Sequence, residues 1–317
     1  ELGAPQEAYR SILVAGTNGK GSIVAMVDQS LRASGYRVGR YTSPHLINLT
    51  ERFVVDGTPI SEPDLTREAE RLFRKIDRLL ETGQLLQPPT FFEATTALAL
   101  DYFCRQHVAI AVLEVGLGGR LDATNIVAPI AGVITPIALD HEQYLGNRLE
   151  AIAVEKAGII KPGMVVITSE TRHEIITIFK EICLDRGARL VQSAQDTLVR
   201  RQSLNTPTDV HITTPRRAYP ACTLALAGDH QHSNAAAAVR LLEELGHEGI
   251  AVGEEAILKG VAEVNWPGRL DLVQVSNRRS VLLDAAHNPS AASALAAHLR
   301  STIPQGVPLV MGVMGDK

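Results

Sequence analysis

Short apolar runs alternate with amphipathic segments of helical length along most of this chain. The apolar runs occupy residues 12–15, 38–41, 108–113, 131–135, 165–168 and 189–191. Strands that alternate with helices are typical of βα units, in which successive strands run parallel. The pattern therefore predicts an α/β fold built on a mostly parallel sheet that helices cover.

Residues 62–82 carry the clearest helical pattern. Their apolar side chains share one helical face, at Leu65, Ala69, Leu72, Ile76 and Leu79. Ser61 is in place to cap the start of this helix, and Gly83 to end it. We expect its charged residues to form a solvated face.

The second half of the chain departs from this pattern twice. A polar stretch at 202–220 predicts a hairpin or loop, after which residues 222–227 resume the strand pattern and residues 234–245 form a helix. A second unit is expected near residue 280, with a strand at 281–284, a helix that begins at Pro289 and a strand at 309–311. Two strands and one helix are too few to bury a parallel sheet on both faces. We therefore expect this unit to be truncated.

Composition narrows the class of protein without identifying it. The chain has 317 residues, 45% of them hydrophobic, which is enough for two domains with cores of their own. Its 31 Lys and Arg against 35 Asp and Glu give a net charge of -4, which indicates no basic face for nucleic acid. Three widely separated cysteines fit a reducing cytosol, and no apolar run reaches membrane-spanning length. We expect a cytoplasmic protein that binds neither nucleic acid nor membrane.

Residues 11–22, SILVAGTNGKGS, lead from a predicted strand through a glycine-rich turn into a predicted helix. Glycines let several backbone N–H groups point at one anion, and the helix adds the positive end of its dipole. The spacing is shorter than in the usual P-loop, and an ordinary glycine-rich turn is the alternative. The strand, turn and helix order favours phosphate binding in a P-loop NTPase-like sheet. The expected phosphate-binding residues are Gly16, Thr17, Asn18, Gly19, Lys20, Gly21 and Ser22.

Polar side chains follow several predicted strands at the point where each strand ends. Glu114 comes after the strand at 108–113, Ser43 after that at 38–41, and His141 a few residues after that at 131–135. The carboxyl ends of parallel strands face the ligand crevice of an open α/β sheet. A carboxylate there can hold Mg²⁺, which prefers oxygen ligands. The alternatives are a solvated strand-end Glu114 and a structural His141.

Seven segments of the chain form one pattern when they are taken together. They are 16–22 (GTNGKGS), 42–45 (TSPH), 114–125 (EVGLGGRLDATN), 139–141 (LDH), 155–161 (EKAGIIK), 267–269 (PGR) and 284–289 (DAAHNP). In this order they resemble the folylpolyglutamate synthase and dihydrofolate synthase family, the folate branch of the Mur-ligase-like enzymes. The resemblance spans nearly the whole chain, and the segment 114–125 is highly specific.

The resemblance implies a site for ATP and two Mg²⁺ ions. Ser43, Glu114 and His141 would bind Mg²⁺ beside the glycine-rich loop. Lys156 would be carbamylated by CO₂ and help to hold the second ion, whereas the sequence by itself is equally compatible with a surface lysine in a salt bridge. The resemblance thus makes Lys20, His141 and Lys156 the expected catalytic residues.

The resemblance also assigns ligand-binding residues outside the glycine-rich loop. The ATP site would include Asn234, Arg269, Asp284 and His287. The pterin substrate would contact Thr90, Phe91, Phe92, Glu93 and Asp122. Three alternatives stay open: Asn234 as a helix-cap partner, Asp284 as a cap, and the phenylalanines as core residues.

The activity that the resemblance implies is ATP-dependent amide formation between L-glutamate and either dihydropteroate or a folate, through an acyl phosphate. Residues 1–279 would form the ATP-binding Mur-ligase central domain, and residues 280–317 the beginning of a smaller, Rossmann-like C-terminal ligase domain. We expect a monomer with weak or no turnover from this chain alone. The alternatives are a Mur-type ligase that adds amino acids to a cell-wall precursor and an ATP-binding module without ligase activity.

Overall fold

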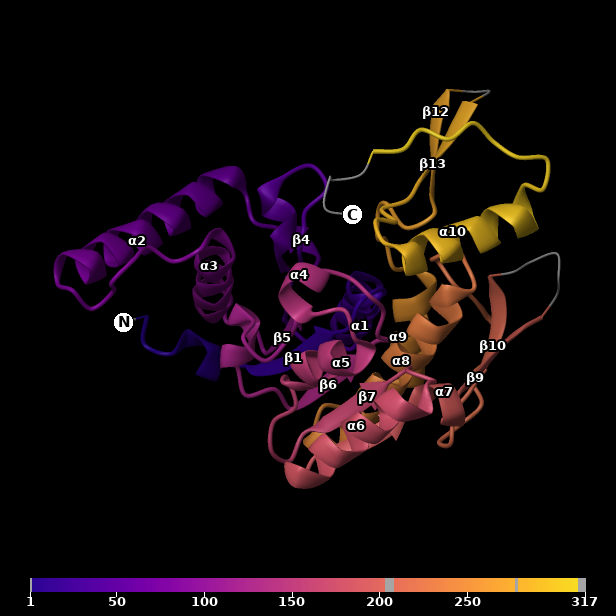
Figure 1. Cartoon of the computed structure of the whole chain (residues 1–317), viewed down its shortest axis with the longest axis horizontal. Coiled ribbons are helices and arrows are strands. Elements are labelled where there is room, and N and C mark those ends of the chain that lie inside the picture. The colour runs from indigo at the N-terminus through magenta and orange to yellow at the C-terminus, as the bar shows by residue number, and fades with distance from the viewer. Residues whose placement is uncertain (1, 203–207, 277–278, 313–317) are drawn as a thin grey trace.

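The computed structural model describes residues 2–202, 208–276 and 279–312, and an eight-stranded sheet runs through its centre (Figure 1). The strands are β1 (Arg10–Ala15), β2 (Val38–Tyr41), β3 (Phe53–Val55), β4 (Thr58–Pro59), β5 (Ile110–Glu114), β6 (Ala131–Ile134), β7 (Val165–Thr168) and β8 (Arg189–Gln192). Their order is β4-β3-β2-β5-β1-β6-β7-β8. All neighbours from β2 to β8 pair in parallel, and β3 and β4 extend one edge in antiparallel pairing. The predicted, mostly parallel sheet is confirmed.

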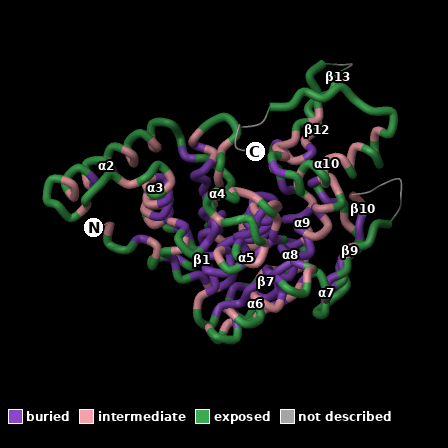
Figure 2. The backbone as a smooth tube through the Cα atoms, viewed as in Figure 1, coloured by how far each residue is buried: buried purple, intermediate pink, exposed green. Residues whose placement is uncertain are grey.

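Successive residues of β1 enter different hydrophobic cores, because side chains alternate between the two faces of a sheet. Ile12 and Val14 belong to a first core and Leu13 and Ala15 to a second. The first core is completed by α1 (Lys20–Ala33), α8 (His230–Glu244) and α9 (Glu254–Ala262). The second is completed by α2 (Glu62–Glu81), α3 (Phe91–Arg105), α5 (Leu149–Ala157) and α6 (His173–Asp185). Figure 2 shows the buried backbone concentrated between these layers.

The helix predicted at 62–82 is confirmed as α2, and the Ser61 side chain accepts a hydrogen bond from the backbone of Asp64 at its start. Of the five apolar positions on its predicted face, Leu72 and Ile76 are buried and the other three are half-buried. The helix lies at the margin of the molecule, where one side is left to solvent (Figure 2).

The strand predicted at 222–227 is mostly wrong. Cys222–Thr223 alone form a strand, β11, and it pairs with β10 (Asp209–Thr213) in a separate sheet with β9 (Leu198–Arg201). Apolar residues of this sheet also enter the first core, so the apolar pattern did not distinguish it from the main sheet. The helix predicted at 234–245 begins earlier, at His230, and Gln231 of its polar first turn is buried.

The last part of the chain forms an antiparallel pair of strands and a helix, β12 (Asp271–Ser276), β13 (Arg279–Leu283) and α10 (Pro289–Thr302). The strand near 281 and the helix at Pro289 are confirmed, and β12 precedes the boundary expected at residue 280. The strand predicted at 309–311 is wrong: these residues have no regular structure, and Val310 is 98% exposed. Without a neighbouring strand or a core to cover it, an apolar run has no reason to extend as a strand.

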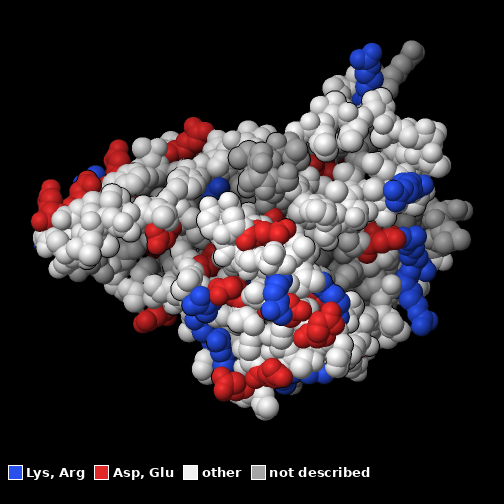
Figure 3. Space-filling view, in the orientation of Figure 1, with Lys and Arg blue, Asp and Glu red and all other residues white. Residues whose placement is uncertain are grey.

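Short elements complete the described chain. They are α4 (Glu142–Leu145), α7 (Ser193–Asp196) and the 3-10 helices η1 (Pro5–Glu7), η2 (Leu49–Arg52), η3 (Ala123–Ile126) and η4 (Leu245–Glu248). No helix among the described residues has the length and apolar character needed to cross a membrane. Acidic and basic side chains are interspersed over the face that Figure 3 shows.

Candidate active site

The turn between β1 and α1 requires glycine at two positions. Gly16 has a φ of 131° and Gly19 a φ of 91°, which side chains with a Cβ rarely adopt. A Cβ at Gly16 would lie 1.8 Å from Thr135 Oγ1, and one at Gly19 would lie 2.4 Å from Asn234 Oδ1. Residues 16–22, the phosphate loop, therefore curl closely around the end of β1 and lead into the N-terminus of α1. This is the arrangement that suits an anion.

Two lysine side chains meet at this loop. Lys20 Nζ donates to the carbonyl oxygens of Gly16 and Thr17 at 3.3 and 3.0 Å, and Lys156 Nζ donates to Gly16 O at 2.8 Å. Lys156 is only 6% exposed. Burial, together with the nearby charge of Lys20, lowers the pKa of Lys156 to about 7. The alternative of a surface lysine in a salt bridge is therefore wrong.

Close backbone packing brings Lys156 to the loop. A Cβ at Gly119 would lie 2.8 Å from the carbonyl oxygens of Glu155 and Lys156, and one at Gly158 would lie 2.4 Å from Arg120 Cα. The backbone N–H of Arg120 donates to Glu155 O at 2.8 Å, and its guanidinium donates to Glu155 Oε1. The glycine-rich segment after β5 thus fixes the end of α5, on which Lys156 lies.

Asp122 belongs to the same glycine-rich segment after β5 and stabilises it. Its carboxylate accepts hydrogen bonds from the backbone N–H groups of Leu117 at 2.8 Å and Thr124 at 3.0 Å. Asp122 therefore stabilises the glycine-rich segment after β5 to which it belongs, and its contact with substrate stays a prediction.

Glu114 lies at the end of β5 and accepts a hydrogen bond from the backbone N–H of Ser43 at 3.1 Å. Its side chain is buried, so a solvated strand-end glutamate is excluded. Burial raises the pKa of Glu114, while the positive charges of Lys20, Arg269 and Arg52 act in the opposite direction. The two expected metal ligands, Glu114 and Ser43, thus lie together, and cations from three segments are near enough to act on Glu114.

This donor set suits Mg²⁺ better than a metal held by protein groups alone. Among the described residues, no group of three or more His, Cys, Asp or Glu side chains is placed to hold a metal ion. Mg²⁺ is commonly bound by one or two carboxylates together with phosphates and water. Glu114 and the Ser43 hydroxyl fit that requirement. His141 has a φ of 51°, and its Nε2 lies 3.9 Å from Asp140 Oδ1, so its role as a ligand stays a prediction.

The segment between β6 and α4, which carries His141, is held from two sides. Thr17 Oγ1 accepts a hydrogen bond from Ala138 N at 2.9 Å and donates to Ala138 O. On the other side the buried Glu170 accepts from Ile137 N at 2.9 Å. Burial opposes ionisation of Glu170, but hydrogen bonds from Arg172 and from backbone N–H groups outweigh it and lower the pKa of Glu170. Sequence analysis missed Glu170, because nothing local in the sequence links it to this segment.

Replacement of Glu170 by glutamine is expected to destabilise the protein by about 1–3 kcal/mol at neutral pH, because a buried N–H loses its acceptor. A lowered pKa means that the carboxylate stabilises the fold above its ordinary pKa of 4.5, and that this stability is lost as the pH falls through the lowered value. Denaturant unfolding of wild type and Glu170→Gln from neutral to acidic pH measures the difference. Glu174→Gln, at an exposed position, is the matched control. Equal stability of all three at pH 7 would contradict this role.

Helix α8 packs against the phosphate loop. The buried Gln231 Nε2 donates to Ser22 Oγ at 3.3 Å, and Asn234 Nδ2 donates to Gln231 Oε1 at 2.9 Å. Asn234 lies inside the helix and against Gly19, so the alternative of a helix-cap partner is wrong. Sequence analysis missed Gln231, which it placed outside the helix.

A pair of asparagines joins the phosphate loop to the last helix. Asn18 Nδ2 donates to Asn288 Oδ1 at 3.1 Å, and Asn288 Nδ2 donates back to Asn18 Oδ1 at 2.9 Å. Asn288 also donates to Asp140 Oδ2 at 3.1 Å and caps α10 by accepting from Ala291 N. His287 Nε2 lies 3.6 Å from the same Asp140 oxygen. Sequence analysis singled out His287 but not Asn288.

Asp284 and Arg269 lie in the two turns that lead into and out of β12 and β13. Asp284 accepts from the backbone N–H groups of Leu270 and Ala286, each at 2.9 Å. It does not cap α10, because Asn288 occupies that position. Arg269 Nη1 donates to Gly268 O at 2.9 Å. The structure thus brings Arg269, Asp284 and His287 to the side of the molecule where the phosphate loop lies, and their contacts with ATP stay predictions.

The expected pterin-binding segment begins α3. Thr90 and Glu93 form a capping box, in which the Glu93 carboxylate accepts from Thr90 N at 2.7 Å and Glu93 N donates to Thr90 Oγ1 at 3.2 Å. Phe92 packs against the second core, so the alternative of a core residue holds for it. Phe91 is 59% exposed, with the Arg52 guanidinium 5.3 Å from its ring centre. Phe91 is thus a largely exposed ring with a cation over it.

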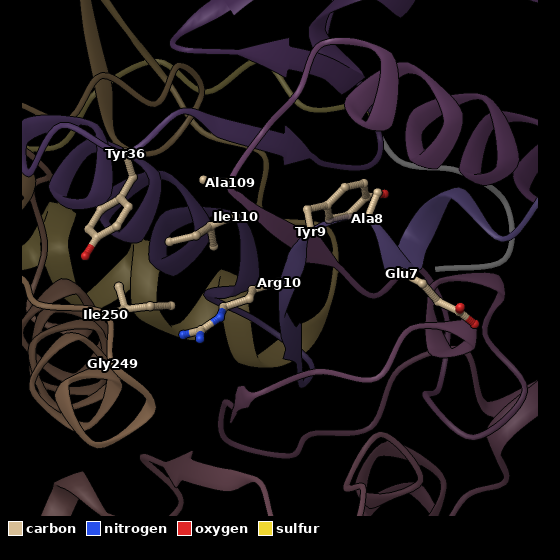
Figure 4. A pocket seen from close by; sticks show the side chains of 9 residues that line it. All are labelled: Glu7, Ala8, Tyr9, Arg10, Tyr36, Ala109, Ile110, Gly249 and Ile250. Carbon is tan, nitrogen blue, oxygen red and sulfur yellow. The ribbon is translucent and has the colours of Figure 1, made fainter.

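Two pockets lie away from the phosphate loop. One, of about 680 Å³, is bordered by the N-terminal segment, α2 and α3, and includes Glu93. The other, of about 400 Å³, lies at the opposite, amino ends of β1 and β5. Figure 4 shows the Arg10 side chain there extending toward Gly249 and Ile250, and the guanidinium donates to Glu248 O. Neither pocket contains the lysines described above.

Comparisons with known proteins place the chain among relatives of named activity. The Mur ligase middle domain matches residues 65–242, and the Mur ligase glutamate ligase domain matches residues 268–317. A Bacillus subtilis dihydrofolate synthase/folylpolyglutamate synthase is 38% identical and covers 100% of this chain and 74% of the relative. The structure of a mutant of L. casei FPGS, at 31% identity, has a TM-score of 0.91 and covers 99% of this chain and 77% of that one. An FPGS complex with AMPPCP and folate, also 31% identical, has a TM-score of 0.89 and covers 96% and 74%.

Proposed function

Since the chain belongs to the folylpolyglutamate synthase and dihydrofolate synthase family of ATP-dependent Mur-type ligases, we propose that it joins L-glutamate to a pterin-containing carboxylic acid. The acceptor is the carboxyl group of dihydropteroate or the terminal γ-carboxyl group of a folate. The observation that carries this proposal is the phosphate loop with Lys20 and Lys156 on one of its carbonyl oxygens. A relative's complex with AMPPCP and folate supports the same two ligand classes.

The reaction proceeds in two steps on the substrates. A carboxylate oxygen of the acceptor attacks the γ-phosphorus of ATP, ADP leaves, and an acyl phosphate forms. The glutamate amine then attacks the acyl carbon, loses a proton, and displaces phosphate as the amide bond forms. Positioning and charge neutralisation are the main contributions of a protein to phosphoryl transfer.

Cationic side chains of this chain neutralise the phosphates in the proposed complex. Lys20 lies inside the phosphate loop, and Arg269 is near enough for its charge to act on Glu114. A guanidinium can bridge two phosphate oxygens, whereas an ammonium acts as a point charge. Asn234, Asp284 and His287 complete the proposed ATP contacts.

Glu114 and Ser43 would hold Mg²⁺ beside these phosphates, with His141 and Lys156 as the further proposed ligands. The ion supplies Lewis-acid polarisation of phosphoryl oxygens when it is bound. The fit rests on the buried Glu114 carboxylate, which the Ser43 backbone holds from one side.

We propose that Lys156 reacts with CO₂, as the resemblance to the family implies. A carbamate forms when an uncharged amine attacks CO₂ and loses a proton, which leaves a carboxylate-like anion on Nζ. A pKa of about 7 leaves much of this amine uncharged near neutral pH. The resulting anion would lie between Gly16 and the end of α5, where Lys20 can balance its charge.

A substrate assay tests the proposed function. With Mg·ATP, dihydropteroate and L-glutamate, we expect release of ADP and phosphate and formation of dihydrofolate, and with tetrahydrofolate as acceptor we expect a longer polyglutamate. Omission of glutamate should abolish product formation. Ligation only with a UDP-linked acceptor would favour the cell-wall alternative, and ATP binding without ligation of any acceptor would favour the binding module.

A further inference from the structure

Trp266 is the single tryptophan of the chain and lies between α9 and β12. Its indole ring rests on the first turn of α1: a Cβ placed on Gly21 would lie 2.8 Å from Trp266 Cζ2 and 2.9 Å from Trp266 Nε1. Gly21 directly follows Lys20 in the phosphate loop. The ring is thus in contact with the backbone that carries the loop lysine.

A second contact also holds the indole. The guanidinium carbon of Arg40, on β2, lies 5.2 Å from the centre of the Trp266 ring, within the range of a cation–π interaction. Arg40 is in turn fixed by Asp28 of α1, whose Oδ2 lies 3.1 Å from Arg40 Nη1. Asp28 is fully buried, so this ion pair is shielded from solvent. The indole therefore contacts two groups that α1 itself positions.

Only two residues separate Trp266 from Arg269. One of them, Gly268, is buried and packs near Leu46: a Cβ at Gly268 would lie 3.3 Å from Leu46 Cδ1. A short segment that is fixed at the indole leaves little freedom for the arginine that follows. The position of Arg269 relative to the phosphate loop is then set by where the indole packs.

We infer that Trp266 is a positioning residue for the nucleotide site. Its indole, in contact with both Gly21 and Arg40, sets the distance between Lys20 and Arg269, so that both cations reach the same polyphosphate. This inference rests on the proposed function, because it takes Lys20 and Arg269 as phosphate contacts. In this inference Trp266 acts through the two cations and not through a contact of its own with substrate.

A double-mutant cycle on the full chain tests the inference, with the dissociation constant of Mg·AMPPCP measured by calorimetry. Trp266→Ala is expected to weaken AMPPCP binding about tenfold, and Trp266→Phe, which keeps an aromatic ring on Gly21, to restore most of it. In an Arg269→Ala background, Trp266→Ala should cause little further loss, because the arginine that it positions is absent. Phe73→Ala, which removes a half-exposed ring from α2, is the control and should bind as wild type.

The outcomes separate this inference from the proposed function. Losses that add in the double mutant would mean that Trp266 acts independently of Arg269, and a Trp266→Phe variant as weak as Trp266→Ala would mean that an aromatic ring on Gly21 is not what matters; either result would overturn the inference. Wild-type affinity in Arg269→Ala would instead remove Arg269 from the proposed ATP site. Thermal unfolding of each variant shows whether the fold is retained.

Discussion

Gly16→Ala is expected to weaken the binding of Mg·ATP by at least about 100-fold, which corresponds to about 3 kcal/mol. Two effects combine at this position. Its φ of 131° strains any residue with a Cβ, and the new methyl group would overlap Thr135, whose Oγ1 and backbone N lie 1.8 and 2.7 Å from it. The turn must open, and its N–H groups then no longer converge on one anion.

The control for Gly16→Ala is Gly163→Ala, which isolates backbone strain from overlap. Gly163 also has a positive φ, of 78°, but a Cβ there has no heavy atom within 4 Å. We expect this variant to bind ATP as wild type does and to be slightly less stable. Lys20→Met tests the charge without disturbing the turn, and it should also bind weakly. If Gly16→Ala binds AMPPCP normally in calorimetry, the phosphate loop is misassigned.

Lys156→Met is expected to abolish ligation while it makes the fold more stable, by roughly 1–4 kcal/mol at pH 7. The side chain is buried, and its pKa falls from 10.5 to about 7 on folding. With the amine free, in buffer without CO₂, the unfolded chain binds more protons than the folded chain between these two pH values, so wild-type stability should rise with pH across this window. The methionine variant has no such group and should lack this slope.

Denaturant unfolding between pH 7 and 10 measures this difference, and Lys161→Met is the control. Burial also lowers the pKa of Lys161, but this side chain lies outside the site and is only half-buried. Carbamylation adds a second readout: removal of dissolved CO₂ should lower wild-type ligation, and bicarbonate should restore it. A Lys156→Met variant with normal ligation would show that this amine takes no part in the reaction.

The parallel strands of the main sheet were predictable, because most of them are apolar and buried on both faces. The antiparallel strands β3 and β4 at its edge were not predicted: β4 has two residues and is exposed. The structure of residues 222–227 could not be predicted in the same way, because an apolar run can pack equally well in a small antiparallel sheet. The phosphate loop was also predictable, because its glycines and lysine are neighbours in sequence. The burial of Lys156 was not, because it depends on packing between Gly119 and the end of α5. No periodicity or local motif in the sequence indicates such a contact.

The polar residues that sequence analysis missed have one feature in common. Glu170, Gln231 and Asn288 each also have a hydrogen-bond partner far away in the chain, and their neighbours in sequence do not indicate that partner. Glu114 and Ser43 could be paired in advance, since both follow parallel strands whose carboxyl ends meet at one edge. Long-range hydrogen bonds from helices and turns follow no comparable rule.

The two amide hydrogen bonds between Asn18 and Asn288 make the loop and α10 energetically dependent on each other. A ligand that draws Asn18 toward itself withdraws an acceptor and a donor from the residue that caps α10. A ligand that pulls α10 inward, in turn, changes how readily the loop admits an anion. Thermodynamic linkage requires the two effects to be equal, so occupancy at either end must alter affinity at the other by the same factor.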